Sequence, residues 1–370
     1  MKRLGFFLML VAAAGLSTSI VSREKSLAAD SNSGSVSPAG SMLRPRSGHS
    51  ATLLPDGRVI IVGGMRRNQD FYRSAEFFDP ATGKFSPAGE MSIGRVGHAA
   101  VLLRSGKVLI AGGWVGHGGT DSAELYDPST GKFTEIAKMT AKRGGPSAVL
   151  LANGDVLITG GAAPSGSGGI ASAEVFNSDK MIFGAVGSMH TARVSHTSTL
   201  LKDGRVLIAG GRGENVTAVA ELYDPEKRQF TATGNMLEAR YKHTAGLLPD
   251  GRVLIAGGST AEDWKGTLKS AEIYDPRTGS FTATSPMNDA RFKLPDEAAQ
   301  LASGQLLIAG GSKQVEIYNP GTGKFSIAAG RISDDWHFMS ETRLKDGKVL
   351  LTGGYAYNDQ ATAQAWIYRP

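Results

Sequence analysis

One short unit, first seen at residues 49–64 as HSATLLPDGRVIIVGG, occurs in seven variants along the chain. Each variant has an apolar run, a tight turn such as Asp-Gly or Asn-Gly, and a second apolar run that ends in two glycines. Such turns favour β-hairpins because glycine readily adopts the positive φ that they require. The seven glycine pairs are Gly63-Gly64, Gly112-Gly113, Gly160-Gly161, Gly210-Gly211, Gly257-Gly258, Gly310-Gly311 and Gly353-Gly354.

The hairpins recur with a regular period. Successive glycine pairs begin 49, 48, 50, 47, 53 and 43 residues apart, and a period near 48 predicts an array of small sheets. After each pair come a variable loop, a third strand such as residues 74–80 and, in all but the last unit, a fourth strand such as residues 84–91. Each complete unit therefore predicts four short strands.

The two ends of the chain complement each other. The seventh unit stops after its third strand, at residues 366–370, whereas residues 33–42 align with the fourth strand of the first unit, residues 82–91. Four-stranded sheets arranged around an axis form a β-propeller, and pairing the chain ends protects two exposed edges. We therefore expect an all-β, seven-bladed propeller whose N-terminal strand completes the last blade. Its repeats start near residues 42, 91, 139, 189, 236, 287 and 331.

These repeats resemble the kelch repeat in their double glycine, in the aromatic residue of the third strand and in the aromatic residue that starts the fourth. The pattern Met-x-x-x-Arg-x-x-His…Leu-Leu-x-Asp-Gly-Arg-Val-Leu-Ile-x-Gly-Gly also resembles the propeller domain of galactose oxidase and its bacterial relatives, over residues 34–370. The resemblance implies that the strand starting at His49 is innermost. It also implies that the loops before this strand and after the double glycine share one face. It does not fix a function, because kelch propellers include enzymes and binding scaffolds.

The copper chemistry of galactose oxidase and glyoxal oxidase is not expected here. In those enzymes, one blade supplies a Tyr-His pair to copper, and a Cys–Tyr crosslink forms the radical. In this chain no tyrosine directly precedes the histidines that start inner strands, and there is no cysteine. We therefore predict no metal and no cofactor, and interpret these histidines as structural. They are His49, His98, His196 and His243.

Six of the seven units also share an arginine, four residues after a methionine, and a glutamate in the third strand. The arginines could form an anion-binding ring at the channel mouth. Alternatively each could pair with the glutamate, because a carboxylate buried between blades needs a partner. The seventh unit has Asp335 in the arginine position and Trp366 in the glutamate position, so both are lost together, which favours pairing. The residues are Arg46, Arg95, Arg143, Arg193, Arg240 and Arg291, with Glu76, Glu124, Glu174, Glu221, Glu272 and Glu316.

Residues 1–29 form a separate segment. Lys2 and Arg3 precede an apolar run, and small residues follow near Ala28, which is typical of a secretion signal. We expect a secreted or periplasmic protein in which residues 30–370 form one propeller; an uncleaved N-terminal anchor is the alternative. The mature chain is expected to have no membrane span and to be a monomer. Its net charge of +6 is spread over interleaved basic and acidic residues, which does not indicate nucleic-acid binding.

Residues that depart from the repeat are the candidates for function, because binding residues commonly lie on loops held by a rigid scaffold. The loops after the glycine pairs, and the segments before the inner strands of units six and seven, combine aromatic and charged residues that suit a polar ligand. We expect them to surround one end of the central channel. The predicted ligand-binding residues are Trp114, His117, Arg212, Glu214, Asp263, Trp264, Asp334, Asp335, Trp336 and Tyr355.

The favoured function is a kelch binding module for a protein or glycan ligand, without catalysis of its own. The alternative is a carbohydrate-active enzyme, an isomerase, lyase or hydrolase, that uses acids from the sixth and seventh units. Asp334, His337 and Glu341 are interpreted as a carboxylate-rich patch in the seventh unit.

Overall fold

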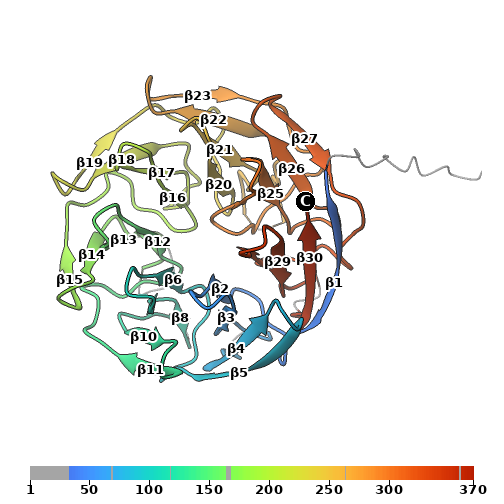
Figure 1. The fold of residues 1–370 in the computed structure, drawn as a ribbon. Helices are drawn as coiled ribbons and strands as arrows, with labels where there is room; N and C mark the ends of the chain where they lie inside the picture. The colour runs from blue at the N-terminus through green and yellow to red at the C-terminus, as the bar shows by residue number, and fades with distance from the viewer. Residues whose placement is uncertain (1–32, 68–69, 117, 164–167, 263, 358–359) are drawn as a thin grey trace, which may run out of the picture.

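The computed structural model describes residues 33–67, 70–116, 118–163, 168–262, 264–357 and 360–370. Seven antiparallel four-stranded sheets form a closed ring around a central axis (Figure 1), which confirms the predicted seven-bladed propeller. The predicted secretion signal, residues 1–29, lies outside the described residues. Within the described ranges, no helix is long and apolar enough to cross a membrane.

The first six blades pair their strands in chain order from the axis outwards. The first blade contains β2 (Ser50–Leu53), β3 (Val59–Val62), β4 (Ser74–Asp79) and β5 (Lys84–Glu90). The second contains β6 (Ala99–Leu102), β7 (Val108–Ala111), β10 (Ala123–Asp127) and β11 (Lys132–Glu135), with a small extra hairpin of β8 (Trp114–Val115) and β9 (Gly118–Gly119). The third contains β12 (Ser147–Leu150), β13 (Val156–Thr159), β14 (Ala173–Asn177) and β15 (Ile182–Ala185).

The later blades follow the same plan. The fourth contains β16 (Thr197–Leu200), β17 (Val206–Ala209), β18 (Ala220–Asp224) and β19 (Gln229–Ala232). The fifth contains β20 (Thr244–Leu247), β21 (Val253–Ala256), β22 (Ala271–Asp275) and β23 (Ser280–Ala283). The sixth contains β24 (Ala299–Gln300), β25 (Leu306–Ile308), β26 (Glu316–Asn319) and β27 (Lys324–Ile327). The seventh contains β28 (Ser340–Arg343), β29 (Val349–Thr352), β30 (Gln364–Arg369) and β1 (Ser35–Ser41).

The hydrophobic core lies between neighbouring blades. The second strand of each blade is buried along its whole length, as in Val59–Val62, because other blades cover both of its faces. Leu207 of the fourth blade, for example, shares one cluster with Val253 and Ile255 of the fifth. The aromatic residue of the third strand packs against that of the fourth, with ring centroids 4.9 Å apart for Tyr223 and Phe230.

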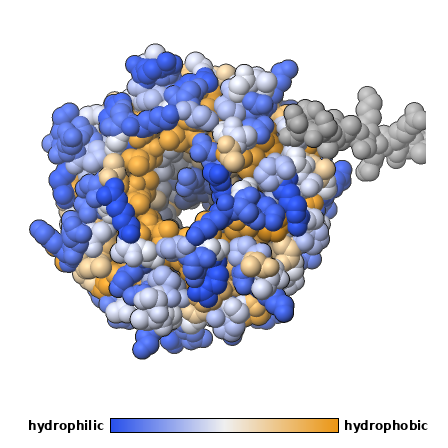
Figure 2. Space-filling view, viewed as in Figure 1, coloured by the Kyte–Doolittle hydropathy of each residue, from blue (hydrophilic) through white to orange (hydrophobic). Residues whose placement is uncertain are grey.

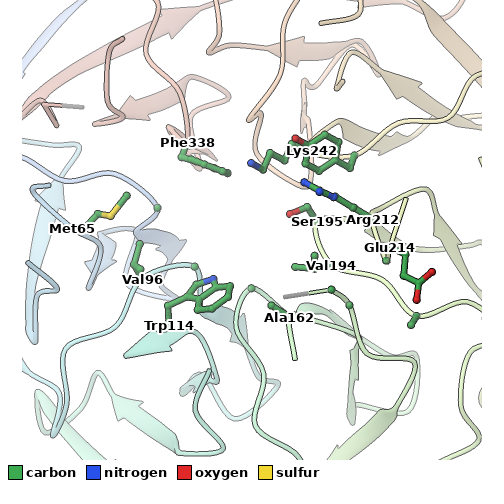
Figure 3. A pocket seen from close by; sticks show the side chains of 18 residues that line it. Met65, Val96, Trp114, Ala162, Val194, Ser195, Arg212, Glu214, Lys242 and Phe338 are labelled. Carbon is green, nitrogen blue, oxygen red and sulfur yellow. The ribbon is translucent and has the colours of Figure 1, made fainter. Parts of the chain in front are cut away.

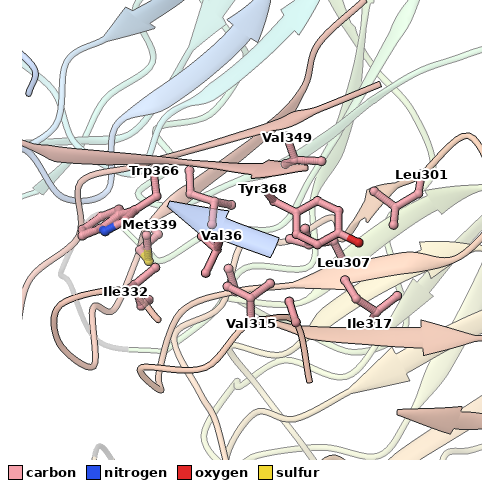
Figure 4. Packing of buried hydrophobic residues seen from close by; sticks show 13 residues of the cluster. Val36, Leu301, Leu307, Val315, Ile317, Ile332, Met339, Val349, Trp366 and Tyr368 are labelled. Atoms are coloured by element: carbon pink, nitrogen blue, oxygen red, sulfur yellow. The ribbon is translucent and has the colours of Figure 1, made fainter. Parts of the chain in front are cut away.

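The ring is closed by the N-terminal strand, as predicted. Strand β1 pairs antiparallel with β30 and sets Val36 opposite Tyr368, the register that Phe85 and Phe78 have in the first blade. Val36 is buried in the cluster between the sixth and seventh blades (Figure 4). Its backbone N–H also donates to the carbonyl of Ala329, 2.8 Å away in the sixth blade. The strand thus joins the first and last parts of the chain.

The repeated arginines and glutamates form six buried ion pairs, which confirms the structural interpretation. Their N–O distances lie between 2.6 and 2.9 Å. In the fourth blade, Arg193 is fully buried, bonds Glu221 at 2.6 Å and also donates to the carbonyls of Gly210 and Val219. Each arginine therefore ties the start of the inner strand to the glycine pair and to the third strand of its own blade.

The seventh blade requires one correction to the sequence alignment. In the other blades the arginine carbonyl accepts a hydrogen bond from the second glycine of the preceding unit, as Arg193 does from Gly161. In the seventh blade Gly311 donates this bond to Trp336, so Trp336 and not Asp335 occupies the arginine position. The extra residue before this inner strand shifts the alignment by one. Trp336 packs against the cluster that contains Trp366, so an apolar contact replaces the ion pair, a replacement that buried ion pairs often tolerate.

The four histidines that start inner strands are buried and connect neighbouring blades. In each case Nε2 lies within hydrogen-bond distance of a hydroxyl of the preceding blade, as for His98 and Ser50 at 2.8 Å or His49 and Thr352 at 2.9 Å. Burial, with a smaller contribution from the neighbouring arginine, lowers the pKa of His98 to about 3. These contacts agree with the structural role expected for the histidines.

Candidate ligand-binding funnel

The residue aligned with Gly48, shortly before the inner strand, has a left-handed backbone conformation in every blade. Its φ lies between 51° and 60° in all seven blades, a region that costs a residue with a Cβ about 1 kcal/mol. Backbone hydrogen bonds connect neighbours in this set, such as Gly97 N–H to the Gly48 carbonyl at 2.8 Å. We call the set the collar; it consists of Gly48, Gly97, Gly145, Ser195, Lys242, Lys293 and Phe338. The first three blades supply bare glycine to the collar, and the last four supply side chains.

A cavity of about 1020 Å³, here called the funnel, adjoins the collar at one end of the central channel (Figure 3). Figure 2 shows the molecule hollowed at its centre, with hydrophobic residues around the opening. Most of the funnel wall is apolar. Its apolar side chains include Met65, Val96, Trp114, Ala162, Val194 and Phe338, and its polar ones are Ser195, Arg212, Glu214, Tyr241 and Lys242.

The fold places the residue after the glycine pair beside the collar. Backbone bridges join this residue to the one that precedes the collar, as for Val96 with Trp114 and Val194 with Arg212. The two loops therefore share one face, as the kelch resemblance implied. This rim position is Met65, Trp114, Ala162, Arg212, Ser259 and Tyr355 in the bridged blades, so its backbone repeats while its side chain does not.

Trp114 lies against the glycine half of the collar. A Cβ built on Gly144 would come within 2.6 Å of Trp114 Cε2, so the indole can lie here only because residue 144 has no side chain. Trp114 is half-buried, and its ring borders the funnel (Figure 3). This wall presents an apolar surface.

The opposite wall carries two cations. Arg212 is half-buried and extends towards the opening, and among the described residues its guanidinium has no hydrogen-bonding or ion-pair partner. Lys242 Nζ lies 5.0 Å from the Tyr241 ring and 5.7 Å from the Phe338 ring. Glu214 is exposed, and its carboxylate points away from the opening in Figure 3. The funnel therefore combines an apolar wall with a cationic one.

A narrower cavity of about 330 Å³ continues from the funnel into the channel and shares collar residues with it. It contains Asp296, Glu297 and Glu341. Glu341 accepts hydrogen bonds from the backbone N–H of Ala309 at 2.7 Å and of Ala299 at 3.2 Å. Burial raises the pKa of Glu341 to about 8. Asp296 is open to channel water but surrounded by protein, and this enclosure, with the nearby Glu297, raises its pKa to about 7.

The insertion in the sixth unit explains these channel acids. The carbonyl of Asp296 accepts a hydrogen bond of 3.1 Å from the N–H of Ala245, which lies in β20 of the fifth blade. The N–H of Ala298 donates to the carbonyl of the same Ala245 at 2.9 Å. With this path β24 is only two residues long, and the N–H of Ala309 donates a hydrogen bond to the Glu341 carboxylate. The sequence showed the insertion but not its course, so its acids were predicted only for the enzyme alternative and not as ligand-binding residues.

A third cavity, of about 460 Å³, is lined by residues of the fifth, sixth and seventh units. Asp334 and His337 line it together with Trp264 and Asp335, whereas Glu341 lies in the channel, so the predicted patch of Asp334, His337 and Glu341 is divided. Trp264 is 4.8 Å from the His337 ring, and Lys293 Nζ lies 4.3 Å above Trp264.

The ten predicted site residues therefore do not form one group. Trp114, Arg212 and Glu214 line the funnel, while Trp264, Asp334 and Asp335 line the third cavity. Tyr355 is buried and accepts a hydrogen bond from Lys293 Nζ at 2.5 Å, and Trp336 packs on the seventh-blade core. His117 and Asp263 lie outside the described residues. Lys242, Tyr241 and Phe338 are funnel residues that were not predicted; the non-glycine residues at the collar position were the available signal.

A solved structure of similar fold is described as a novel fungal alcohol oxidase with catalytic diversity among the AA5 family, in complex with copper. It is 15% identical, covers 91% of this chain and 76% of its own, and has a TM-score of 0.71. At this identity the likeness shows the fold alone. A comparison with curated protein sequences finds no match.

The residues of this chain do not fit the copper site of such oxidases. The inner-strand histidines lie in different blades, and each Nε2 is within hydrogen-bond distance of a Ser or Thr hydroxyl. Across the ranges that the structure describes, no group of three or more His, Asp or Glu side chains is placed to hold a metal ion.

The motif comparison agrees with the repeat structure. The Kelch motif matches residues 45–92, 95–140 and 240–288, which correspond to the first, second and fifth repeats. The chain is thus a seven-bladed β-propeller that carries Kelch motifs.

Proposed function

We propose that this protein is a binding module that takes a segment of a partner protein into the funnel. Kelch propellers commonly bind proteins. The observation that carries the proposal is the rim position, where a repeated backbone presents four different side chains to the funnel, those of Met65, Trp114, Ala162 and Arg212. Aromatic and arginine side chains such as Trp114 and Arg212 are the types that dominate binding at protein interfaces.

A protein ligand suits the funnel better than a neutral glycan. Sugars present hydroxyl groups that need several hydrogen-bonding partners, whereas the wall around Val96, Trp114 and Val194 is apolar. The cavity volume of about 1020 Å³ is at the upper end for small-ligand sites, which suits a segment of several residues. We also propose that residues 1–29 direct export and that the exported protein is a monomer.

Selection from a random peptide library on the immobilised protein tests this function. Ala162→Trp should block the funnel, and its melting curve is compared with that of the wild type, because Val194 lies where Gly144 makes room for Trp114 in the second blade. Ile182→Trp, at an exposed site on the outer strand β15, is the matched control. We expect selected peptides to bind the wild type and Ile182→Trp but not Ala162→Trp. Equal binding to all three proteins, or binding of glycans alone, would refute the proposal.

The channel acids favour one second candidate, a carbohydrate-active enzyme. A carboxylic acid that stays protonated near neutral pH can act as a general acid, and the pKa values of Asp296 and Glu341 are raised to about 7 and about 8. Turnover in a screen of glycosides that is abolished by Asp296→Asn and kept in Arg212→Gln would support this candidate over the binding module.

A further inference from the structure

We infer that the funnel recognises an acidic peptide segment, in which an Asp or Glu adjoins a bulky apolar residue. The carboxylate would lie against Arg212 and Lys242, and the apolar side chain against Trp114. This inference rests on the proposed binding function and specifies the chemistry of its partner.

The first observation is the positive charge of Arg212 in the funnel. Arg212 has no ion-pair partner among the described residues although it is half-buried, and the nearest acid on the same loop, Glu214, is turned away from it (Figure 3). A guanidinium binds a carboxylate through two parallel hydrogen bonds. The arrangement therefore leaves a cation ready for an anionic ligand group.

The second observation is that the collar contains a lysine, Lys242, beside the funnel. Lys242 has a φ of 53°, whereas Gly48, Gly97 and Gly145 hold the equivalent position with no cost from a Cβ. A non-glycine residue in such a conformation is a reason to suspect a functional role. Its ammonium group adds a second positive charge on the same wall as Arg212 (Figure 3).

The third observation is the apolar wall opposite these two cations. Trp114 faces this pair of cations across the opening, and Val96 extends its surface (Figure 3). A ligand that satisfies both walls needs a carboxylate and an apolar group a few ångströms apart, which neighbouring side chains of a peptide provide. A sugar acid has the carboxylate but would set most of its hydroxyl groups against apolar side chains.

Three pools of labelled octapeptides test the inference by fluorescence anisotropy. The pools are identical in their random positions and carry a central Glu-Leu, Gln-Leu or Lys-Leu pair. On the wild-type protein we expect the Glu-Leu pool to bind at least about tenfold more tightly than the other two, since only its carboxylate can accept charge-assisted hydrogen bonds from Arg212. Arg212→Gln should remove this preference, and Arg212→Glu should shift it towards the Lys-Leu pool.

Arg205→Gln, which changes an arginine on a distant exposed turn, is the matched control and should leave the preference intact. Equal or tighter binding of the Gln-Leu or Lys-Leu pool that Ala162→Trp still blocks would refute the acidic ligand and keep the binding function. No binding of any pool would refute both. Displacement of the Glu-Leu pool by free glucuronate at lower concentration than by the matching unlabelled peptides would assign the site to a sugar acid instead.

Discussion

Two arginines of the fourth blade have opposite surroundings. Arg193 is fully buried, bonds Glu221 at 2.6 Å and donates to two backbone carbonyls. Arg212 is half-buried at the funnel and has no such partner among the described residues. The first has a counterpart in five other blades, and the second in none. The comparison teaches that residues which recur from repeat to repeat hold the blades together, whereas rim residues that differ from the repeat can contact a ligand.

The largest expected effect comes from breaking the repeated frame at its closure. Deleting residues 33–42 should abolish cooperative unfolding, because it uncovers β30 and the cluster around Val36. Circular dichroism melting measures the loss. A permuted chain that carries the same residues after Pro370 is the control and should melt like the wild type. An unchanged melting curve for the deletion would show that β1 is dispensable.

The next effect concerns the buried ion pairs. Arg193→Ala and Glu221→Ala should each lower the free energy of unfolding by about 3–5 kcal/mol, because each leaves an unpaired buried charge. The double variant should lose less than the sum of the two. Arg205→Ala breaks the exposed pair with Asp203 and should cost at most about 1 kcal/mol. Urea unfolding gives all four values, and strictly additive losses would contradict a coupled pair.

The seventh blade sharpens the comparison, because Trp336 was predicted from sequence as a ligand contact and lies in the position of the paired arginines. Trp336→Ala should lower the free energy of unfolding by about 2 kcal/mol, since the half-buried indole packs on the core around Trp366. The peptide affinity of the funnel should not change. Loss of affinity with full stability would restore Trp336 to the binding site.

Smaller effects come from single buried histidines. The pKa of His98 is lowered to about 3 in the folded protein from an unfolded value near 6.5, so the unfolded chain binds more protons between these values. Stability is therefore lost as pH falls from 6.5 towards 3, by about 1.4 kcal/mol per pH unit for each such histidine. His98→Gln should reduce the slope of unfolding free energy between pH 6 and pH 4 by about this amount. An unchanged slope would mean that His98 titrates alike in both states.

The repeated frame could be predicted from sequence because the seven repeats can be aligned with one another, so that each position is seen several times. Six spacings between the glycine pairs, the match of residues 33–42 to residues 82–91 and the joint loss of arginine and glutamate in one unit predicted the fold, its closure and the ion pairs. The one misplaced position, Asp335 instead of Trp336, followed an extra residue, where the repeats no longer define the register.

The site could be predicted only in part, because its residues differ from those at the same position in the other repeats, and aligning the repeats does not show what they contact. The rim position correctly placed Trp114 and Arg212 at the funnel. Sequence could not show that Tyr355 would be buried beneath Lys293, since this contact joins the sixth and seventh blades across the collar. Nor could it show that the insertion would pair with β20 and expose Asp296 to the channel.

The most direct test of the central claim is the free energy of unfolding of Arg212→Ala, measured in urea beside Arg193→Ala. The account predicts that Arg212→Ala stays within about 0.5 kcal/mol of the wild type, because among the described residues this guanidinium has no hydrogen-bonding or ion-pair partner to lose. A loss comparable to that of Arg193→Ala would show that Arg212 holds the fold together, and would contradict the separation of frame and site.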